Sequence, residues 1–290
     1  MKKIFFLLIL IYSVQLFSQD IIEEENETDF IIGKLLEEEE TLDEFIKAIT
    51  NFQFLYFSVD YNNKTYFSGR DIDLDQFNIA PQVSYMNSNG FFAGISGIYY
   101  SEFVPKFDYV ALNIGFGRNF GKQKNFRWSS SYTRYFYSPG VDNPFKNTFT
   151  ASFGLKNKKK NFGGQVSGTY LFGDEDSFQF ITSSFASINL YTSENNSLKL
   201  RPQVNILVGK QIVELSRNIT IGNQTITQYI QNDEIGLINT QLNIPLQLNI
   251  KNYDFELGYT INLPSELAGE SNLNITSFVN FSIAYFLDWD

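Results

Sequence analysis

The sequence predicts an all-β fold: a closed antiparallel up-and-down transmembrane β-barrel of about 12 strands, preceded by a short N-terminal amphipathic helix. Three observations lead to this fold class. Long segments alternate apolar and polar residues with a period of two, the polar residues are mostly amides and hydroxyls, and the links between segments tend to alternate between short and longer. The chain of 290 residues is long enough for one large domain.

The alternation is clearest near the C-terminus. Between residues 238 and 250, the polar Asn239, Gln241 and Asn243 lie between Ile and Leu residues, and the two following segments repeat the pattern. Such a period indicates strands with two unlike faces. The predicted strands are 52–60, 75–87, 91–103, 107–120, 125–138, 147–157, 161–173, 177–192, 198–213, 235–250, 253–264 and 274–289. Bulky residues occupy both phases of the third, fifth and eighth segments, so a one-residue slip there would exchange the faces.

The links between these segments favour a membrane barrel. Short turns are expected at 87–90, 157–160, 193–197 and 251–252, and longer links at 61–74, 139–146, 214–234 and 265–273; the links near 104–106 and 174–176 are also short. Short turns on one side and longer loops on the other are typical of outer-membrane barrels. Within the 213–234 link, two β-branched stretches flank Gly222-Asn223, which predicts a hairpin protruding beyond the membrane.

The polar phase distinguishes a membrane barrel from a soluble one. A soluble β-sandwich would turn its apolar phase inward and long charged side chains outward, whereas here the polar phase is mainly Ser, Thr, Asn, Gln and Gly. These residues suit a wet, confined interior. Aromatic residues at strand ends, at 99–100, 135–137 and 170–172, are expected to form interface girdles, with ordinary core packing as the alternative.

The N-terminal region has a different composition. Residues 1–19 combine paired lysines with the apolar run 4–11, which predicts a secretory signal peptide. Residues 20–51 hold twelve acids and two lysines and form an acidic periplasmic arm. The arm is predicted to contain a short helix whose capping box is Thr41 and Glu44; its apolar face comprises Leu42, Phe45, Ile46 and Ile49. This helix either plugs the lumen, docks on another protein, or is a spacer that packs on the 52–290 barrel.

These features resemble the Gram-negative outer-membrane β-barrel superfamily over residues 1–19 and 52–290. The last amphipathic strand ends at Trp289, as in members whose aromatic-rich final strand is used for assembly, although Asp290 follows it here. The resemblance implies a location in the outer membrane, with lipid as a partner.

Composition excludes several functions. The absence of His and Cys removes imidazole bases, His-paired nucleophiles, thiolate zinc sites and disulfides. The near-neutral barrel and acidic arm argue against nucleic acid as a partner. Asp71, Asp73 and Asp75 resemble the start of a calcium loop, but the required Gly and closing Glu are missing, so no metal and no cofactor is expected. No enzyme activity is expected either.

The inward phase supplies the candidate site. The expected lumen-lining residues are Lys199, Arg201, Gln203, Asn239, Gln241, Asn243, Asp254, Glu256, Arg127 and Lys156. Lys199 and Arg201 are expected at the same depth as Asp254 and Glu256, toward the short turns. There these charges either orient solutes across a pore or form a salt-bridge network that closes it; acid–base work by the two carboxylates is a further alternative.

Two functions follow from this sequence. The first is a porin-like passive channel for small polar solutes. The alternative is a non-transporting scaffold of a larger envelope assembly, which would use the 20–51 arm to bind a periplasmic or membrane protein and the 213–234 hairpin outside.

Overall fold

The structure is a computed structural model that describes residues 53–121, 124–141, 143–193, 196–210, 212–221, 224–231, 235–267 and 270–288. The predicted signal peptide, acidic arm and helix therefore lie outside the described residues, as does Trp289. The strands are β1 (Gln53–Asn62), β2 (Asn78–Asn87), β3 (Phe91–Tyr100), β4 (Phe107–Phe120), β5 (Phe126–Tyr137), β6 (Phe145–Lys156), β7 (Phe162–Gly173), β8 (Asp176–Ala186), β9 (Ile188–Thr192), β10 (Asn196–Leu200), β11 (Gln203–Lys210), β12 (Ile212–Ile221), β13 (Gln224–Gln231), β14 (Gly236–Ile250), β15 (Tyr253–Pro264) and β16 (Thr276–Asp288).

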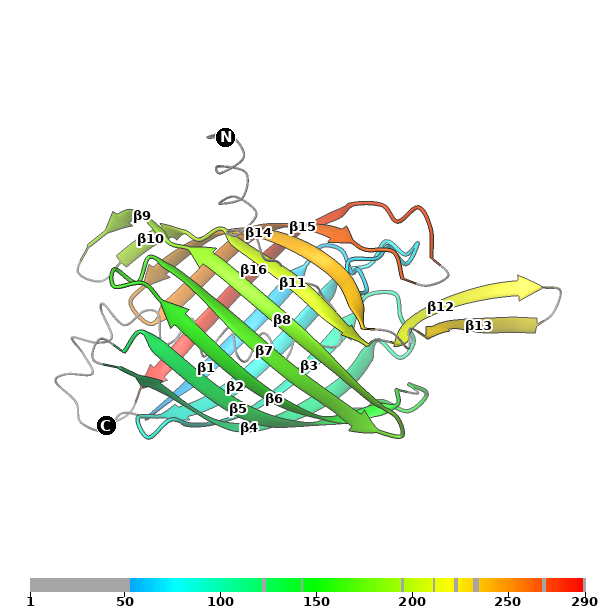
Figure 1. The fold of residues 1–290 in the computed structure, drawn as a ribbon, viewed down its shortest axis with the longest axis horizontal. Helices are drawn as coiled ribbons and strands as arrows, with labels where there is room; N and C mark the ends of the chain where they lie inside the picture. Colours follow the sequence, from blue (N-terminus) through cyan, green and yellow to red (C-terminus); the bar gives the residue numbers. More distant parts are fainter. Residues whose placement is uncertain are drawn as a thin grey trace, which may run out of the picture.

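Twelve positions around the ring close the barrel, as the sequence predicts (Figure 1). Consecutive strands β1 to β8 pair antiparallel, β8 pairs with β11, β11 with β14, and β14 with β15. The ring closes through β15 with β16 and β16 with β1. Closure leaves no unpaired sheet edge within the ring, which is the condition for crossing a lipid bilayer with strands.

Two predicted strands are each broken into two pieces. The predicted segment 177–192 divides into β8 and β9 at Ser187, and 198–213 divides into β10 and β11 at Arg201-Pro202. Both upper pieces continue the same ladder, because β9 pairs with β10 and β10 pairs with β14. Pro202 has no N–H to donate, so the regular ladder is interrupted there.

The barrel has two unlike ends. At the short-turn end, links of two to five residues join β2 to β3, β4 to β5, β6 to β7, β9 to β10 and β14 to β15; β1 also begins there. The long-loop end carries residues 63–77 and 265–275. It also carries the β12–β13 hairpin, whose predicted pairing is confirmed by Ile221 opposite Gln224. Figure 1 shows this hairpin extending beyond the barrel.

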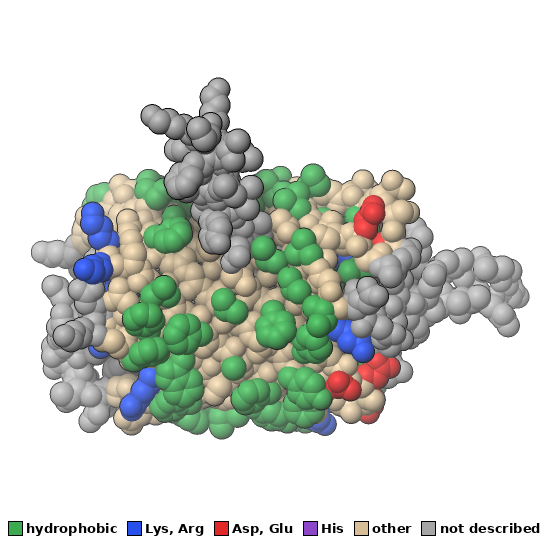
Figure 2. Space-filling model, in the orientation of Figure 1, with side chains coloured by type: hydrophobic (Ala, Val, Ile, Leu, Met, Phe, Trp, Pro, Cys, Tyr) green, Lys and Arg blue, Asp and Glu red, His purple; other side chains and the backbone are tan. Residues whose placement is uncertain are grey.

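The two faces of the sheet differ in the way that the sequence predicts. Outward residues such as Leu112, Ile114 and Phe153 are 45–50% exposed, whereas inward Thr150 and Ser152 are buried. Figure 2 shows the hydrophobic side chains spread over the middle of the barrel, with charged side chains toward its ends. The inward hydroxyls pair across strands, as in the 2.9 Å contact between the Oγ1 atoms of Thr150 and Thr169. Among the described residues, no helix is long and apolar enough to cross a membrane.

The predicted aromatic girdle is wrong for two of its members. Tyr100 and Tyr135 point inward and are only 5% and 2% exposed, packed with Tyr109 at the long-loop end. Tyr170 and Phe136, by contrast, lie on the outward face at 47% and 51% exposure. Adjacent aromatic residues in one strand must face opposite sides, so only alternate members can reach the lipid.

Candidate functional site

The inward face of the barrel contains all ten candidate residues. Three are half-buried: Lys156, Lys199 and Asn243. The other seven are buried: Arg127, Arg201, Gln203, Asn239, Gln241, Asp254 and Glu256.

The charges near the short-turn end are linked along the wall through Gln247. Lys199 pairs in register with Gln247, and Gln247 pairs with Glu256. The side-chain amide of Gln247 donates to Glu256 Oε2 at 3.0 Å, and the Asn280 amide donates to Glu256 Oε1 at 3.3 Å. One acid and one base thus lie in the same row of strand partners, on neighbouring sides of a bridging amide.

Other charges lie on opposite walls. Arg127 is on β5, and Asp254 and Glu256 are on β15, which is six strands from β5 in either direction around the ring. Arg201 lies near the acidic wall, with its guanidinium 4.2 Å from the centre of the Phe185 ring, a cation–π distance. The lumen near the short turns therefore has a basic side and an acidic side, an arrangement that orients polar solutes.

A chain of amides lines the lumen toward the long-loop end. The Gln203 amide donates to Asn205 at 3.0 Å, Asn205 to Gln241 at 3.4 Å, and Gln241 to Asn262 at 3.0 Å. The Asn262 amide in turn donates to Thr276 Oγ1 at 3.1 Å. Mutual hydrogen bonds satisfy these buried groups and hold the side chains in fixed positions on the wall.

The largest difference from the sequence-based expectation is residues 63–77, which we name the inner loop. The sequence suggests only a long link, yet Thr65, Tyr66 and Ser68 are 1–7% exposed. Tyr66 packs against Phe278 of β16 at a ring distance of 6.2 Å, and its hydroxyl donates to the Ser277 carbonyl at 3.2 Å. The inner loop therefore packs against the barrel wall at the long-loop mouth.

The tip of the inner loop is a tight turn against the amide wall. Phe67 and Arg70 exchange backbone hydrogen bonds at 2.9–3.0 Å. Ser68 and Gly69 have φ of 51° and 77°, as a type I′ turn requires. A Cβ on Gly69 would lie only 2.6–2.8 Å from side-chain atoms of Asn239. Only glycine allows this approach, which places the turn directly on a lumen-lining residue.

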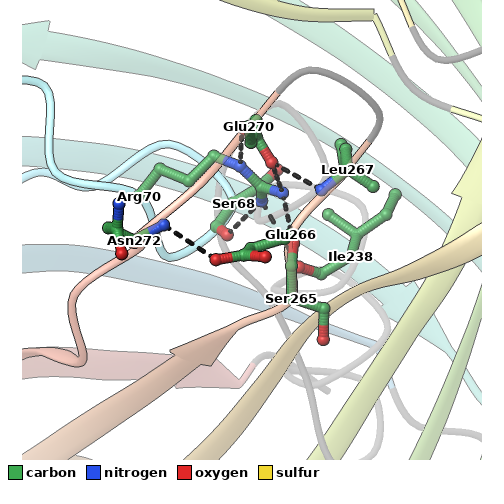
Figure 3. Close-up of polar contacts among 8 residues, drawn as sticks. All are labelled: Ser68, Arg70, Ile238, Ser265, Glu266, Leu267, Glu270 and Asn272. Carbon is green, nitrogen blue, oxygen red and sulfur yellow. Dashed lines mark hydrogen bonds and ion pairs between the residues drawn. The ribbon is translucent and has the colours of Figure 1, made fainter.

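A buried ion pair holds the inner loop in place (Figure 3). The Arg70 guanidinium binds both carboxylate oxygens of Glu270, at 2.7 and 2.8 Å. It also donates to the carbonyls of Ser68, Ile238 and Ser265 at 2.8–3.3 Å. The two side chains are 1% and 3% exposed. One side chain thus joins the inner loop, the start of β14 and the 265–275 loop.

Glu270 is kept ionised by this arrangement. Burial alone would raise its pKa, but the hydrogen bonds from Arg70 and the Leu267 N–H, together with the Arg70 charge, lower the pKa below the usual value for Glu. Because the carboxylate is stabilised in its charged form, the ion pair persists at neutral pH.

Sequence reasoning missed the inner loop because its partners are far away in the chain. Arg70 and Glu270 are separated by 200 residues, and neither stands in a recognisable motif. The available local signal was the cluster of apolar Tyr66 and Phe67 before a glycine in a supposed loop. The neighbouring Asp71, Asp73 and Asp75 are exposed; within the described ranges, no group of three or more acids is placed to hold a metal.

The closed ring, the apolar outward face and the polar inward face define a class: a membrane-spanning β-barrel of the outer-membrane type, with a polar lumen. No protein-family model matches the sequence, and no curated protein matches it. Among solved structures, the chain is similar to the KdgM porin (8% identity, 80% of this chain and 98% of that chain, TM-score 0.44). It is also similar to the NanC porin (9%, 80% and 98%, 0.46) and to LpxR from Salmonella typhimurium (10%, 81% and 100%, 0.47).

Proposed function

We propose that this chain is a porin-like passive channel that admits small polar solutes across the outer membrane. The observation that carries the proposal is the inward wall, which presents amides, hydroxyls and opposed charges while the outward face is apolar. A solute crossing the lumen exchanges its water for these donors and acceptors. A ring of twelve strands encloses a space between that of side-chain-filled eight-stranded barrels and that of open sixteen-stranded porins.

The inner loop supports a narrow channel rather than a wide one. It packs inside the long-loop mouth against β14 and β16, and the Arg70–Glu270 pair prevents it from moving freely. Solutes would therefore pass a constriction formed by residues 63–77, which limits their size.

The orientation follows from the links. Outer-membrane barrels place short turns in the periplasm and longer loops outside the cell. The inner loop and the β12–β13 hairpin would then face the exterior, and the outward apolar belt would contact lipid. The lumen carboxylates have no catalytic part in this proposal, because Glu256 is held by the amides of Gln247 and Asn280 as a wall residue.

Planar-bilayer recording of the purified full chain tests the channel. We expect steady conductance, with larger conductance from a variant lacking residues 20–51. The double variant Asp254→Asn/Glu256→Gln should shift ion selectivity toward anions, because it removes the acidic wall and leaves the basic one. Matched changes at the exposed Asp71 and Asp73 should shift selectivity far less. Absence of conductance from the full chain and from the shortened chain would overturn the proposal.

One observation favours the second candidate, a scaffold in an envelope assembly. The β12–β13 hairpin extends beyond the barrel wall as a separate two-stranded sheet (Figure 1), and such a ribbon offers strand edges to another protein. A stoichiometric partner that co-purifies with the full chain, and is lost when residues 213–234 or 20–51 are deleted, would support the scaffold over the channel.

A further inference from the structure

The inward wall at the short-turn end contains an apolar area that breaks the polar rule of the lumen. We name it the aromatic patch; its members are Phe54, Tyr56, Met86, Phe92 and Phe286. They come from β1, β2, β3 and β16, which are consecutive around the ring. The Phe286 ring lies 4.9 Å from Tyr56 and 6.2 Å from Phe54. An aromatic surface in the mouth of a polar lumen indicates an apolar contact at this position.

The opposite wall of the same mouth is basic. Lys156 ends β6, which is six strands from β16 in either direction, and Arg127 begins the neighbouring β5. The rim continues this charge: the five short-turn links contain six lysines and a single acid, Glu194. Figure 2 shows Lys and Arg side chains at this end and the visible Asp and Glu side chains toward the other. The mouth therefore combines one apolar side with one basic side.

The chain enters the barrel at this same mouth. β1 begins at Gln53, directly after the segment that holds twelve acids and two lysines. The helix predicted for residues 41–49 has its apolar side chains on one face, and Asp43 and Glu44 lie off that face at 100° per residue. Five residues separate Ile49 from Phe54, and an extended chain covers that separation in about 17 Å. The segment is therefore tethered within reach of both sides of the mouth.

We propose that residues 37–49 bind in the short-turn mouth of their own barrel. Leu42, Phe45, Ile46 and Ile49 contact the aromatic patch, and the acids at 37–40, 43 and 44 face the basic wall and rim. The occupant is this segment rather than another protein because tethering gives it a high effective concentration, and because its sequence complements both sides of the mouth. If the chain is the channel proposed above, the segment closes its periplasmic entrance.

Thiol labelling of the full chain tests this binding without measuring ion flow, so its outcome is independent of the channel proposal. The chain has no cysteine, so Ile46→Cys and Thr28→Cys each introduce a single thiol into the same acidic arm. We expect a bulky maleimide to label the Ile46→Cys thiol at least tenfold more slowly than the Thr28→Cys thiol in detergent micelles. Equal rates at the two positions would overturn the proposal.

Two companion variants identify the surface responsible. Adding Tyr56→Ser, which places a small polar residue in the aromatic patch, or Lys156→Glu, which reverses a charge on the basic wall, should restore fast labelling of the Ile46→Cys thiol. The matched change Lys146→Glu, at the long-loop end of the same strand, should leave the protection intact. Protection that is unchanged by both companion variants, or that disappears on dilution as expected for a second copy or another protein, would overturn the proposal.

Discussion

Replacing Arg70 by Met should release the inner loop while leaving the barrel closed. The substitution keeps the backbone N–H and much of the side-chain volume but removes every hydrogen bond that the guanidinium donates. It also leaves the Glu270 carboxylate, 3% exposed, without its counter-charge. Breaking a buried ion pair by removing one partner costs about 3–5 kcal/mol. At about 1.4 kcal/mol per tenfold, the opening equilibrium of the inner loop should rise by roughly a hundredfold to a few thousandfold.

Hydrogen exchange of the inner-loop amides measures this change directly. The N–H groups of Phe67 and Arg70 bond to each other's carbonyls only while the turn is intact, so their protection should fall by that factor. Lys64→Met is the matched control, because it breaks the exposed pair with Asp75 in the same loop, and exposed pairs contribute little. Equal protection in the wild-type chain and the Arg70→Met variant would show that the ion pair does not hold the loop.

Three further predictions concern pH, backbone and lipid. Because the folded pKa of Glu270 is lowered, the stability that it gives the inner loop should be constant above the usual Glu pKa and lost only as the pH falls through the lowered value; amide protection followed under acid checks this sign. Gly69→Ala should lower the unfolding temperature more than Gly140→Ala: both positions have positive φ, costing about 1–2 kcal/mol for alanine, but only position 69 also has a close contact. Ile114→Arg, on the outward face at the middle of its strand, should cost about 2–4 kcal/mol in vesicle unfolding, whereas Asn113→Asp on the adjacent inward position should cost far less; equal costs would contradict the assigned faces.

Much of the barrel could be predicted from sequence because strand alternation is a local property. A side chain two residues further along a strand returns to the same face, so Asn239, Gln241 and Asn243 indicate the lumen phase of β14 without knowledge of any neighbour. The β12–β13 hairpin was equally accessible, since a Gly-Asn pair between β-branched stretches specifies its own turn.

Strands with bulky residues on both phases needed the pairing to be known. Phe91 and Phe92 are identical in sequence terms, yet Phe92 is 2% exposed and inward while Phe91 is 36% exposed. Phe180 and Ile181 divide in the same way, at 49% and 2%. Their faces are decided by the register with neighbouring strands, which is set across the whole ring rather than within one segment.

The sequence by itself determined an exported-type chain, a twelve-strand closed barrel, its apolar outward phase and its polar, charged inward phase. These features depend on a period of two and on the chemistry of adjacent residues, which the printed sequence contains. Only the tertiary structure decided that residues 63–77 turn inward, that Arg70 meets Glu270, and that an aromatic patch faces a basic wall at the short-turn mouth. Contacts between residues far apart in the chain arise when the ring closes, and no local pattern records them.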